Sequence, residues 1–205
     1  MNQKIQIIEK PEWVSWDDIH EVLIKAHAQN RANGINMKKP TLPGEKIAEE
    51  IGDEGKMFVA LDGERVVGTS AIVVKRKSYW CGGKQERYAC IYFASVLPEY
   101  VGQGIFKELD LKREKESLSM GIDKMLGDTH ERNQHRLKIA QKAGYKFVDC
   151  KFCGDHYNVV MVKWLNGCPY SDIRCWYEFH KRKLIVKAKT KMKSLIKLFS
   201  PQQAM

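Results

Sequence analysis

The chain has 205 residues, of which 43% are hydrophobic, and a formal net charge of +10. This length suits one α/β domain with a sizeable core, and no apolar run reaches the roughly 18 residues that predict a membrane-spanning helix. Residues 181–205 hold eight Lys or Arg and no Asp or Glu, so only +2 of the +10 belongs to residues 1–180. A nearly neutral domain argues against nucleic acid as the main partner.

The N-terminal residues include no long apolar stretch, so they do not predict a signal peptide, and we expect a cytoplasmic location. The six cysteines are then expected to be thiols rather than disulfides. Cys150 and Cys153 have the CxxC spacing, but Cys168 and Cys175 do not form a second close pair. The spacing therefore disfavours a structural zinc site, and we expect no metal.

The first predicted helix begins just after Ser15, which is placed as its N-cap, while Asp18 completes a capping box. Its apolar residues recur at helical spacing until about Gly34. A short helix over 45–51 comes next. It is followed by a β-hairpin with strands over 57–61 and 65–74.

The segment 88–96 is almost wholly apolar and aromatic, which predicts a central strand buried on both faces. Gly102 and Gly104 then form a tight turn that opens a helix over 105–120. The remaining predicted elements are a strand over 124–129, a helix over 133–143 that Gly144 ends, and an antiparallel pair over 146–152 and 157–165. This order predicts an α/β (α+β) domain with a mixed sheet and helices on its faces.

The glycine turn joins a buried strand directly to a helix. Successive backbone N–H groups at a helix start have no partner within the helix, and the helix dipole adds positive potential there. Together they form a socket for a phosphate or pyrophosphate. No Gly-Lys-Ser/Thr follows, so the turn is not a Walker loop, and the glycine spacing does not match a dinucleotide fingerprint.

Residues 96–105 resemble the acetyl-CoA-binding motif of the GNAT acetyltransferases, whose pattern is Gln/Arg-x-x-Gly-x-Gly/Ala. The pattern falls on 101–106, with Gly104 as its central glycine. A second match is Asn133 followed by Gly144-Tyr145, which is similar to the family's Asn … Gly-Phe segment. The resemblance implies a mostly antiparallel central sheet flanked by helices, and the sequence beyond the resemblance predicts a basic helical C-terminal extension. We expect a GNAT-like domain over 1–166 and the extension over 167–205.

The resemblance also implies that acetyl-CoA is the co-substrate. Its pyrophosphate would be held by the backbone amides of Val101, Gly102, Gln103, Gly104, Ile105 and Phe106. Its pantetheine arm would bond the backbone of Ala94, Ser95 and Val96 at the end of the central strand. Asn133 would contact the same arm, and a strand N–H would stabilise the oxyanion formed during acyl transfer. The usual Arg/Gln and Gly/Ala of the motif are here Val101 and Phe106.

The side chains that would act as acid and base in acyl transfer do not follow from the motif. The family's thiol-protonating tyrosine would fall on Ala140, and the glutamate base of some members near Cys90, so both are missing. Alternation places Tyr92 on the same face as Cys90 and Ala94, where it could donate to the thiolate or be a plain buried aromatic. His130 has the natural pKa of a general base, and its alternative is an exposed loop histidine.

Beyond residue 165 the family pattern ends, and residues 181–199 predict a basic amphipathic helix. This helix either lies peripherally on the anionic inner face of a membrane, or docks on its own domain or on a second subunit of a homodimer. Nucleic acid is disfavoured, because the tail lacks interleaved arginines and aromatics.

These features lead to two functional hypotheses. The first is an acetyl-CoA-dependent N-acetyltransferase that modifies the amine of a small molecule, for example an amino sugar of envelope biosynthesis. The second is a non-catalytic CoA-binding module that its basic tail tethers to a membrane or a partner.

Overall fold

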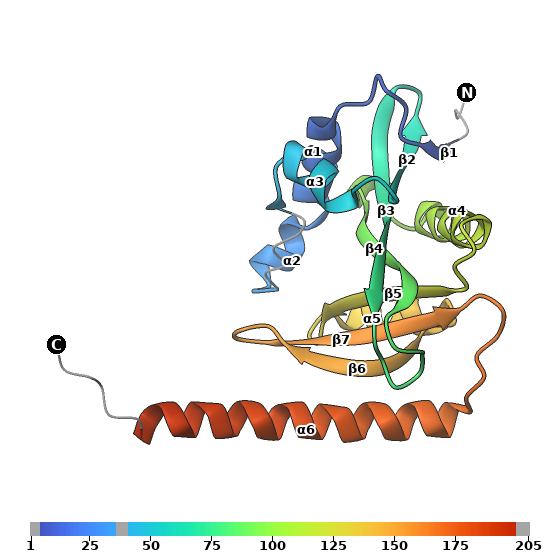
Figure 1. Cartoon of the computed structure of the whole chain (residues 1–205). Coiled ribbons are helices and arrows are strands. Elements are labelled where there is room, and N and C mark those ends of the chain that lie inside the picture. The colour runs from blue at the N-terminus through green and yellow to red at the C-terminus, as the bar shows by residue number, and fades with distance from the viewer. Residues whose placement is uncertain (1–4, 36–40, 200–205) are drawn as a thin grey trace.

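In the part of the chain that the structure describes, seven β-strands form a single sheet (Figure 1). The computed structural model describes residues 5–35 and 41–199, with side chains as far as residue 193. In spatial order the strands are β1 (Gln6–Glu9), β2 (Lys56–Asp62), β3 (Arg65–Lys77), β4 (Glu86–Val96), β5 (Lys124–His130), β7 (Tyr157–Trp164) and β6 (Lys146–Phe152). Only β4 and β5 pair in parallel. The predicted mixed, mostly antiparallel sheet is therefore confirmed.

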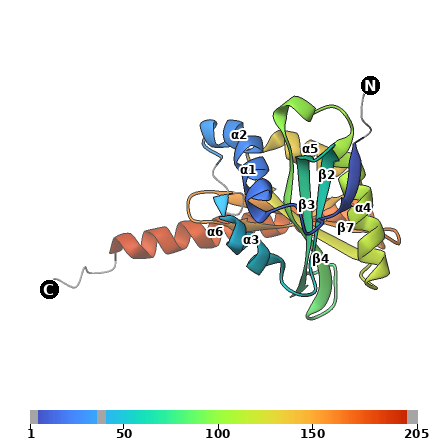
Figure 2. The same ribbon diagram turned by 90° about the horizontal axis from the view of Figure 1, so that it is seen from above.

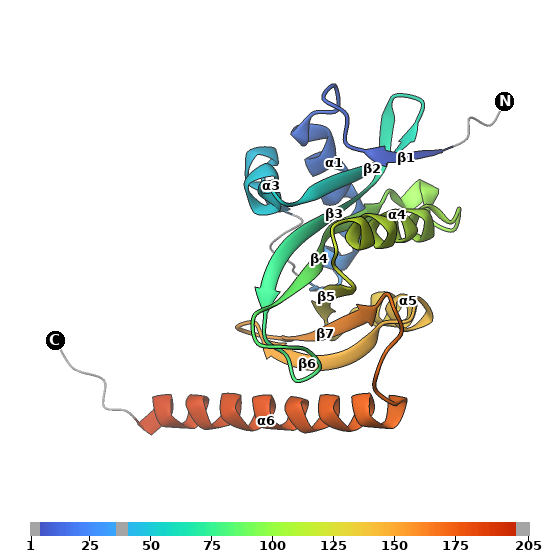
Figure 3. The same cartoon turned by 45° about the vertical axis from the view of Figure 1, so that its right-hand side comes forward.

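Helices cover both faces of this sheet. Three of them lie on one face: α1 (Trp16–Ala26), α2 (Ala28–Ala32) and α3 (Gly44–Ile51). On the other face lie α4 (Ile105–Ser119), as Figure 2 shows, and α5 (Gln134–Lys142), which Figure 3 shows on the same side as α4. The long helix α6 (Asp172–Phe199) runs beside the edge strand β6 (Figure 3). Residues 1–4 of the predicted domain and 200–205 of the predicted extension lie outside the described residues.

The start of α1 forms as its sequence predicts. Ser15 Oγ accepts a hydrogen bond from the backbone N–H of Asp18 at 3.1 Å, and Asp18 Oδ2 accepts one from the backbone N–H of Ser15 at 2.9 Å. The apolar positions Ile19, Val22 and Leu23 are buried in the main core. These contacts fix α1, whose C-terminal end reaches the candidate site.

Three elements differ from the prediction. β1 was not expected, because a four-residue strand with no buried side chain has no clear alternation. β4 was predicted to be buried on both faces, but Ile91 and Tyr92 are only half-buried. They follow Cys90, the last residue of β4 that pairs with β5. α6 begins at Asp172 rather than at residue 181, because Phe179 in this aromatic segment packs into a small core under β6.

A buried polar cluster ties α4 to the sheet. Arg113 on α4 is fully buried, forms an ion pair with Asp110, and donates a hydrogen bond to Ser70 Oγ on β3. The Tyr145 hydroxyl donates to Asp110 Oδ1 at 3.4 Å. Burial and the neighbouring Asp110 raise the pKa of Tyr145, so it stays a neutral donor. The cluster holds α4, and with it the glycine turn, in one position.

Candidate active site

The sheet opens between β4 and β5. The two strands pair only at Ala89 with Met125 and at Cys90 with Leu126, although β4 continues to Val96. Among the described residues, the β5-facing backbone of 91–96 has no strand partner, because β4 and β5 separate beyond Cys90. Unpaired strand N–H and C=O groups can bind an extended, amide-containing ligand as a further strand would. This opening is the predicted place of Ala94, Ser95 and Val96.

A β-bulge shapes the end of β4. Phe93 has a φ of 52°, and its carbonyl accepts a hydrogen bond from Thr69 Oγ1 at 2.7 Å. A bulky residue at positive φ costs roughly 1–3 kcal/mol, and such strain concentrates at functional sites. The bulge also changes the alternation: Tyr92 lies opposite Ala71 and Ser95 opposite Thr69. Tyr92 therefore shares its face with Ser95, and the prediction that it shares a face with Ala94 is wrong.

The glycine turn follows the bulge and begins α4. Gly102 and Gly104 have φ values of 91° and 81°, which side-chain-bearing residues rarely adopt. Among the described residues the backbone N–H groups of 102–107 have no hydrogen-bond acceptor, whereas that of Val101 donates to Pro98 O at 3.2 Å. The backbone N–H groups available to a phosphate thus start at Gly102. The prediction that the Val101 amide is one of them is wrong, because that amide is already hydrogen-bonded. Gln103, Ile105 and Phe106 belong to the remaining row of donors.

Two cations lie beside this turn. The guanidinium of Arg136 on α5 stacks on the Phe106 ring at 4.4 Å from its centroid, and that of Arg113 lies 5.8 Å from it. Burial and the nearby Arg113 lower the pKa of Arg136 to about 10, so it remains charged at neutral pH. Phe106, an exception to the motif, therefore positions a cation near the free amides. The sequence did not point to Arg136, because no motif or spacing around residue 136 indicates that its side chain contacts Phe106.

Asn133 is the N-cap of α5. Its Oδ1 accepts a hydrogen bond from the backbone N–H of Arg136 at 3.2 Å. The cap uses the amide oxygen and leaves the NH₂ group without a partner among the described residues. Contact with a cofactor arm through this NH₂ group stays a prediction.

His130 ends β5 and is buried, so its alternative as an exposed loop histidine is wrong. Its ring stacks on His156 with 4.3 Å between centroids, and Asp155 Oδ1 lies 2.6 Å from His156 Nδ1. Burial and the adjacent His156 lower the pKa of His130. His130 Nδ1 accepts from the backbone N–H of Arg132 at 3.0 Å, which leaves the proton of the neutral ring on Nε2. In this tautomer the free ring nitrogen of His130 is a donor, and Nδ1 is already occupied as an acceptor.

Tyr92 is half-buried on β4. Burial and the neighbouring Cys90 raise its pKa, so the phenol is protonated at neutral pH. A neutral phenol can donate a hydrogen bond or a proton, as the sequence-based hypothesis requires. Its assignment as a catalytic residue remains a prediction.

The structure adds His27, which sequence reasoning missed. His27 lies where α1 meets α2, and its Nε2 is 3.0 Å from Ser95 Oγ on the bulged end of β4. Asn30 Nδ2 lies 3.3 Å from His27 Nδ1. Burial, followed by the charge of Arg31, lowers the pKa of His27 to about 4, so the ring is neutral at physiological pH. No local signal relates residues 27 and 95 in the sequence.

The depressed pKa of His27 predicts a pH-dependent stability. Because the unfolded chain binds this proton below pH 6.5 and the folded chain only below about pH 4, stability falls as the pH drops through that window, by up to about 3 kcal/mol. Urea unfolding of wild type and His27→Gln between pH 7 and pH 4 measures this. The variant should lose less stability on acidification. Parallel pH profiles for the two proteins would contradict the assignment.

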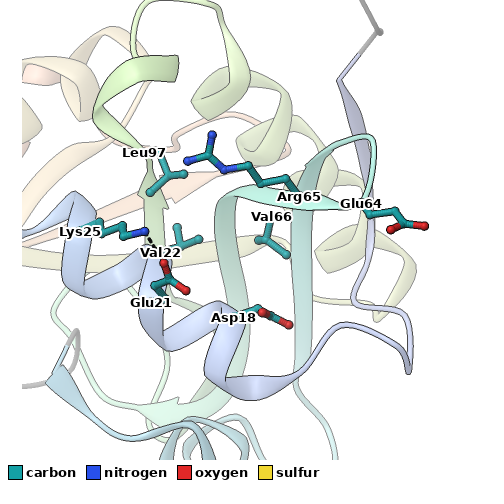
Figure 4. Close-up of a pocket in the computed structure, with 8 residues that line it drawn as sticks. All are labelled: Asp18, Glu21, Val22, Lys25, Glu64, Arg65, Val66 and Leu97. Atoms are coloured by element: carbon teal, nitrogen blue, oxygen red, sulfur yellow. Dashed lines mark hydrogen bonds and ion pairs between the residues drawn. The ribbon is translucent and has the colours of Figure 1, made fainter.

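A separate small cavity of about 150 Å³ lies between α1, the β2–β3 hairpin and the end of β4 (Figure 4). Glu21 and Lys25 point toward each other and form an ion pair, and Arg65 pairs with Glu99 at 2.7 Å. Ligand pockets usually have at least about 300 Å³. This cavity is therefore too small to be the main site, and its charged side chains already form ion pairs with protein groups.

Two further findings concern metal ligands and membrane-spanning helices. The described residues contain no group of three or more His, Cys, Asp or Glu side chains that could hold a metal ion. Of the helices in the described ranges, none combines the length and the apolarity needed to cross a bilayer.

Comparisons with known proteins agree with this geometry. The model of the acetyltransferase (GNAT) family matches residues 16–145. Similar solved structures include an acetyltransferase from Streptococcus agalactiae 2603, with 18% identity, coverage of 80% of this chain and 99% of that chain, and a TM-score of 0.60. An acetyltransferase of the GNAT family from Staphylococcus aureus Mu50 has 16% identity, coverages of 79% and 99%, and a TM-score of 0.60.

A third similar structure is the ribosomal-protein-S18-alanine N-acetyltransferase from Escherichia coli, with 12% identity, coverages of 79% and 94%, and a TM-score of 0.57. At these identities the structural likeness shows the fold alone. No curated protein sequence matches the chain significantly. The family model, however, covers more than half of the sequence and includes the opened strand, the glycine turn and Asn133. The chain therefore belongs to the acetyltransferase (GNAT) family.

Proposed function

We propose that this family member is an acetyl-CoA-dependent N-acetyltransferase that acts on the amine of a small molecule. The observation that carries the proposal is the opening between β4 and β5, which leads directly into the row of unpaired amides at 102–107. The backbone at 94–96 can bond an amide-containing arm, and the turn beside Arg136 can hold its pyrophosphate. The residues present thus fit acetyl-CoA, although the glycine turn alone does not select the acyl group.

The overall reaction defines what the side chains must do. The acceptor nitrogen bonds to the acetyl carbon, the carbon–sulfur bond breaks, and one proton passes from nitrogen to sulfur. Negative charge develops on the thioester oxygen, so a hydrogen-bond donor directed at it lowers the barrier. Positioning of the two reactants supplies a further share of the rate.

Ser95 is the side chain best placed to be that donor. When Asn30 donates to His27 Nδ1, the imidazole proton is on Nε2 and is donated to Ser95 Oγ. The Ser95 hydroxyl proton is then directed elsewhere and can stabilise the oxyanion beside the strand amide. His27 acts here as a positioning residue for Ser95, and Tyr92 on the same face is the candidate proton donor to sulfur.

The test is the release of free thiol from acetyl-CoA with a panel of amines that includes amino sugars, beside the matching alcohols. Release with one class of amine supports N-acetylation, and release with alcohols alone would contradict it. In the same assay Ser95→Ala should lower kcat about 100-fold and leave the KM for acetyl-CoA nearly unchanged. Ser119→Ala at the exposed end of α4 is the matched control and should behave as wild type.

The second candidate function is a CoA-binding module without turnover. It is favoured by Ala140, which is buried at the position where the family's tyrosine would lie. Both functions predict binding of coenzyme A, but only the enzyme releases thiol. Binding by calorimetry without thiol release from any amine or alcohol would support the module and overturn the enzyme.

A further inference from the structure

Helix α6 has two apolar sides, and only one of them is covered. On the covered side Cys175 and Phe179 are buried, and Phe179 packs with Cys150 and Val159 of the β6–β7 pair. The opposite side carries large apolar side chains with high exposed fractions. They are Ile173 (81%), Tyr177 (57%), Leu184 (70%) and Met192 (61%). At about 3.6 residues per turn these four lie within one stripe of roughly 100°, here called the outer stripe.

The outer stripe faces away from the protein's own domain. Figures 1 and 3 show α6 lying below β6 and continuing beyond the end of the sheet. The side facing the sheet is held by ion pairs, Lys146 with Asp172 at 2.6 Å and Lys183 with Glu131 at 3.7 Å. Docking on its own domain therefore explains the inner side of α6 and leaves the outer stripe exposed among the described residues, where the Tyr177 ring has a cation–π contact with Lys181 of the same helix.

The charges around the outer stripe have one sign. Residues 181–199 contain eight Lys or Arg and no Asp or Glu. Exposed lysines occur along the same part of the helix, at positions 181, 187, 189, 191 and 193. By the same helical period, Lys181 and Lys191 fall within the arc of the outer stripe and the other exposed lysines lie beside it. A surface that complements this helix must therefore offer both apolar and anionic groups.

We propose that α6 docks the protein flat on an anionic lipid bilayer. The outer stripe enters the headgroup boundary, the lysines contact lipid phosphates, and the domain sits on the side away from the bilayer. A second copy of this chain is a poor occupant, because a shared stripe would bring two lysine-rich helices together without any acidic residue over 181–199. Nucleic acid is also a poor occupant, because its phosphates would face the apolar stripe. The proposal does not depend on acetyl transfer.

The test is sedimentation of the full chain with vesicles of phosphatidylcholine, with and without phosphatidylglycerol. Wild type should bind the anionic vesicles and bind less as salt rises. Leu184→Glu/Met192→Glu should reduce this binding at least about tenfold, because both side chains leave the apolar layer and add like charge to the lipid. The matched control is Leu111→Glu/Leu118→Glu, which makes the same charge change at two exposed leucines on α4 and should bind nearly as wild type.

Three outcomes would overturn the proposal. The first is equal weakening in both double variants, which would show a net-charge effect without insertion. The second is wild-type protein that stays in solution with anionic vesicles. The third is a dimer, seen by light scattering, that only the α6 variant dissociates. Both variants should keep the wild-type circular dichroism and coenzyme A affinity, so a failed vesicle test is distinct from a failed functional assignment.

Discussion

Gly104→Val is expected to weaken the binding of coenzyme A by more than about 100-fold, a loss of about 3 kcal/mol. Gly104 is the residue that begins α4, and its φ of 81° is strained for any side chain and most of all for a β-branched one. An added Cβ would meet no protein atom within 4 Å, so the new side chain would occupy the space in front of the turn. The substitution therefore disturbs the free amides and fills the place of the ligand.

Gly121→Val is the matched control for this variant. Gly121 also has a positive φ, of 68°, with nothing within 4 Å of an added Cβ, but it follows the opposite end of α4. Both variants should lose similar stability in thermal unfolding. Calorimetry with coenzyme A should detect the loss of affinity only for Gly104→Val, and equal affinities in the two variants would show that the turn is not the phosphate site.

Arg113→Ala is expected to destabilise the fold by about 3–5 kcal/mol. Arg113 is fully buried, and its removal would leave Asp110 as a buried carboxylate with only the Tyr145 hydroxyl at 3.4 Å. It would also leave Ser70 Oγ without its donor and a cavity where the side chain was. Urea unfolding measures the change, and the denaturant midpoint should fall with little change in slope.

Lys112→Ala, at the position of α4 just before Arg113, is the comparison for the loss of stability. Lys112 forms a partly exposed ion pair with Glu116 at 3.7 Å, and such pairs contribute at most about 1 kcal/mol. The double variant Arg113→Met/Asp110→Leu removes both buried charges and should recover much of the stability that Arg113→Ala loses. An Arg113→Ala protein within about 1 kcal/mol of wild type would mean that the cluster is not what holds α4 in place.

Family membership and side-chain geometry support different parts of the functional assignment. The match over 16–145 establishes that the chain belongs to the acetyltransferase (GNAT) family. The acceptor is not given by the fold, since one fold can carry different activities. The acceptor chemistry can now be tested through three residues. Ser95 and Tyr92 lie on one face of the opened strand β4, and His27 contacts Ser95 from the end of α1.

The sequence by itself determined the features that arise from short-range patterns. The Ser15 capping box, the apolar strands and the position of Gly104 each depend on residues within one or two turns or one strand of each other. Local hydrogen bonding and backbone sterics operate over those distances, so the element order, the fold class and the glycine turn could be predicted. The start of a helix at Asn133 belongs to the same group, although the structure makes Asn133 the N-cap and Gln134 the first helical residue.

Only the tertiary structure decided which distant residues meet. His27 and Ser95 are 68 positions apart, and their contact depends on how α1 packs across β3 and β4. The burial of His130, the bulge at Phe93 that turns Ser95 to the face of Tyr92, and the uncovered side of α6 likewise have no local signal. Their physical cause is long-range: strand register and helix docking decide which groups lose water and which face one another, and neither is specified by the residues next to them in the chain.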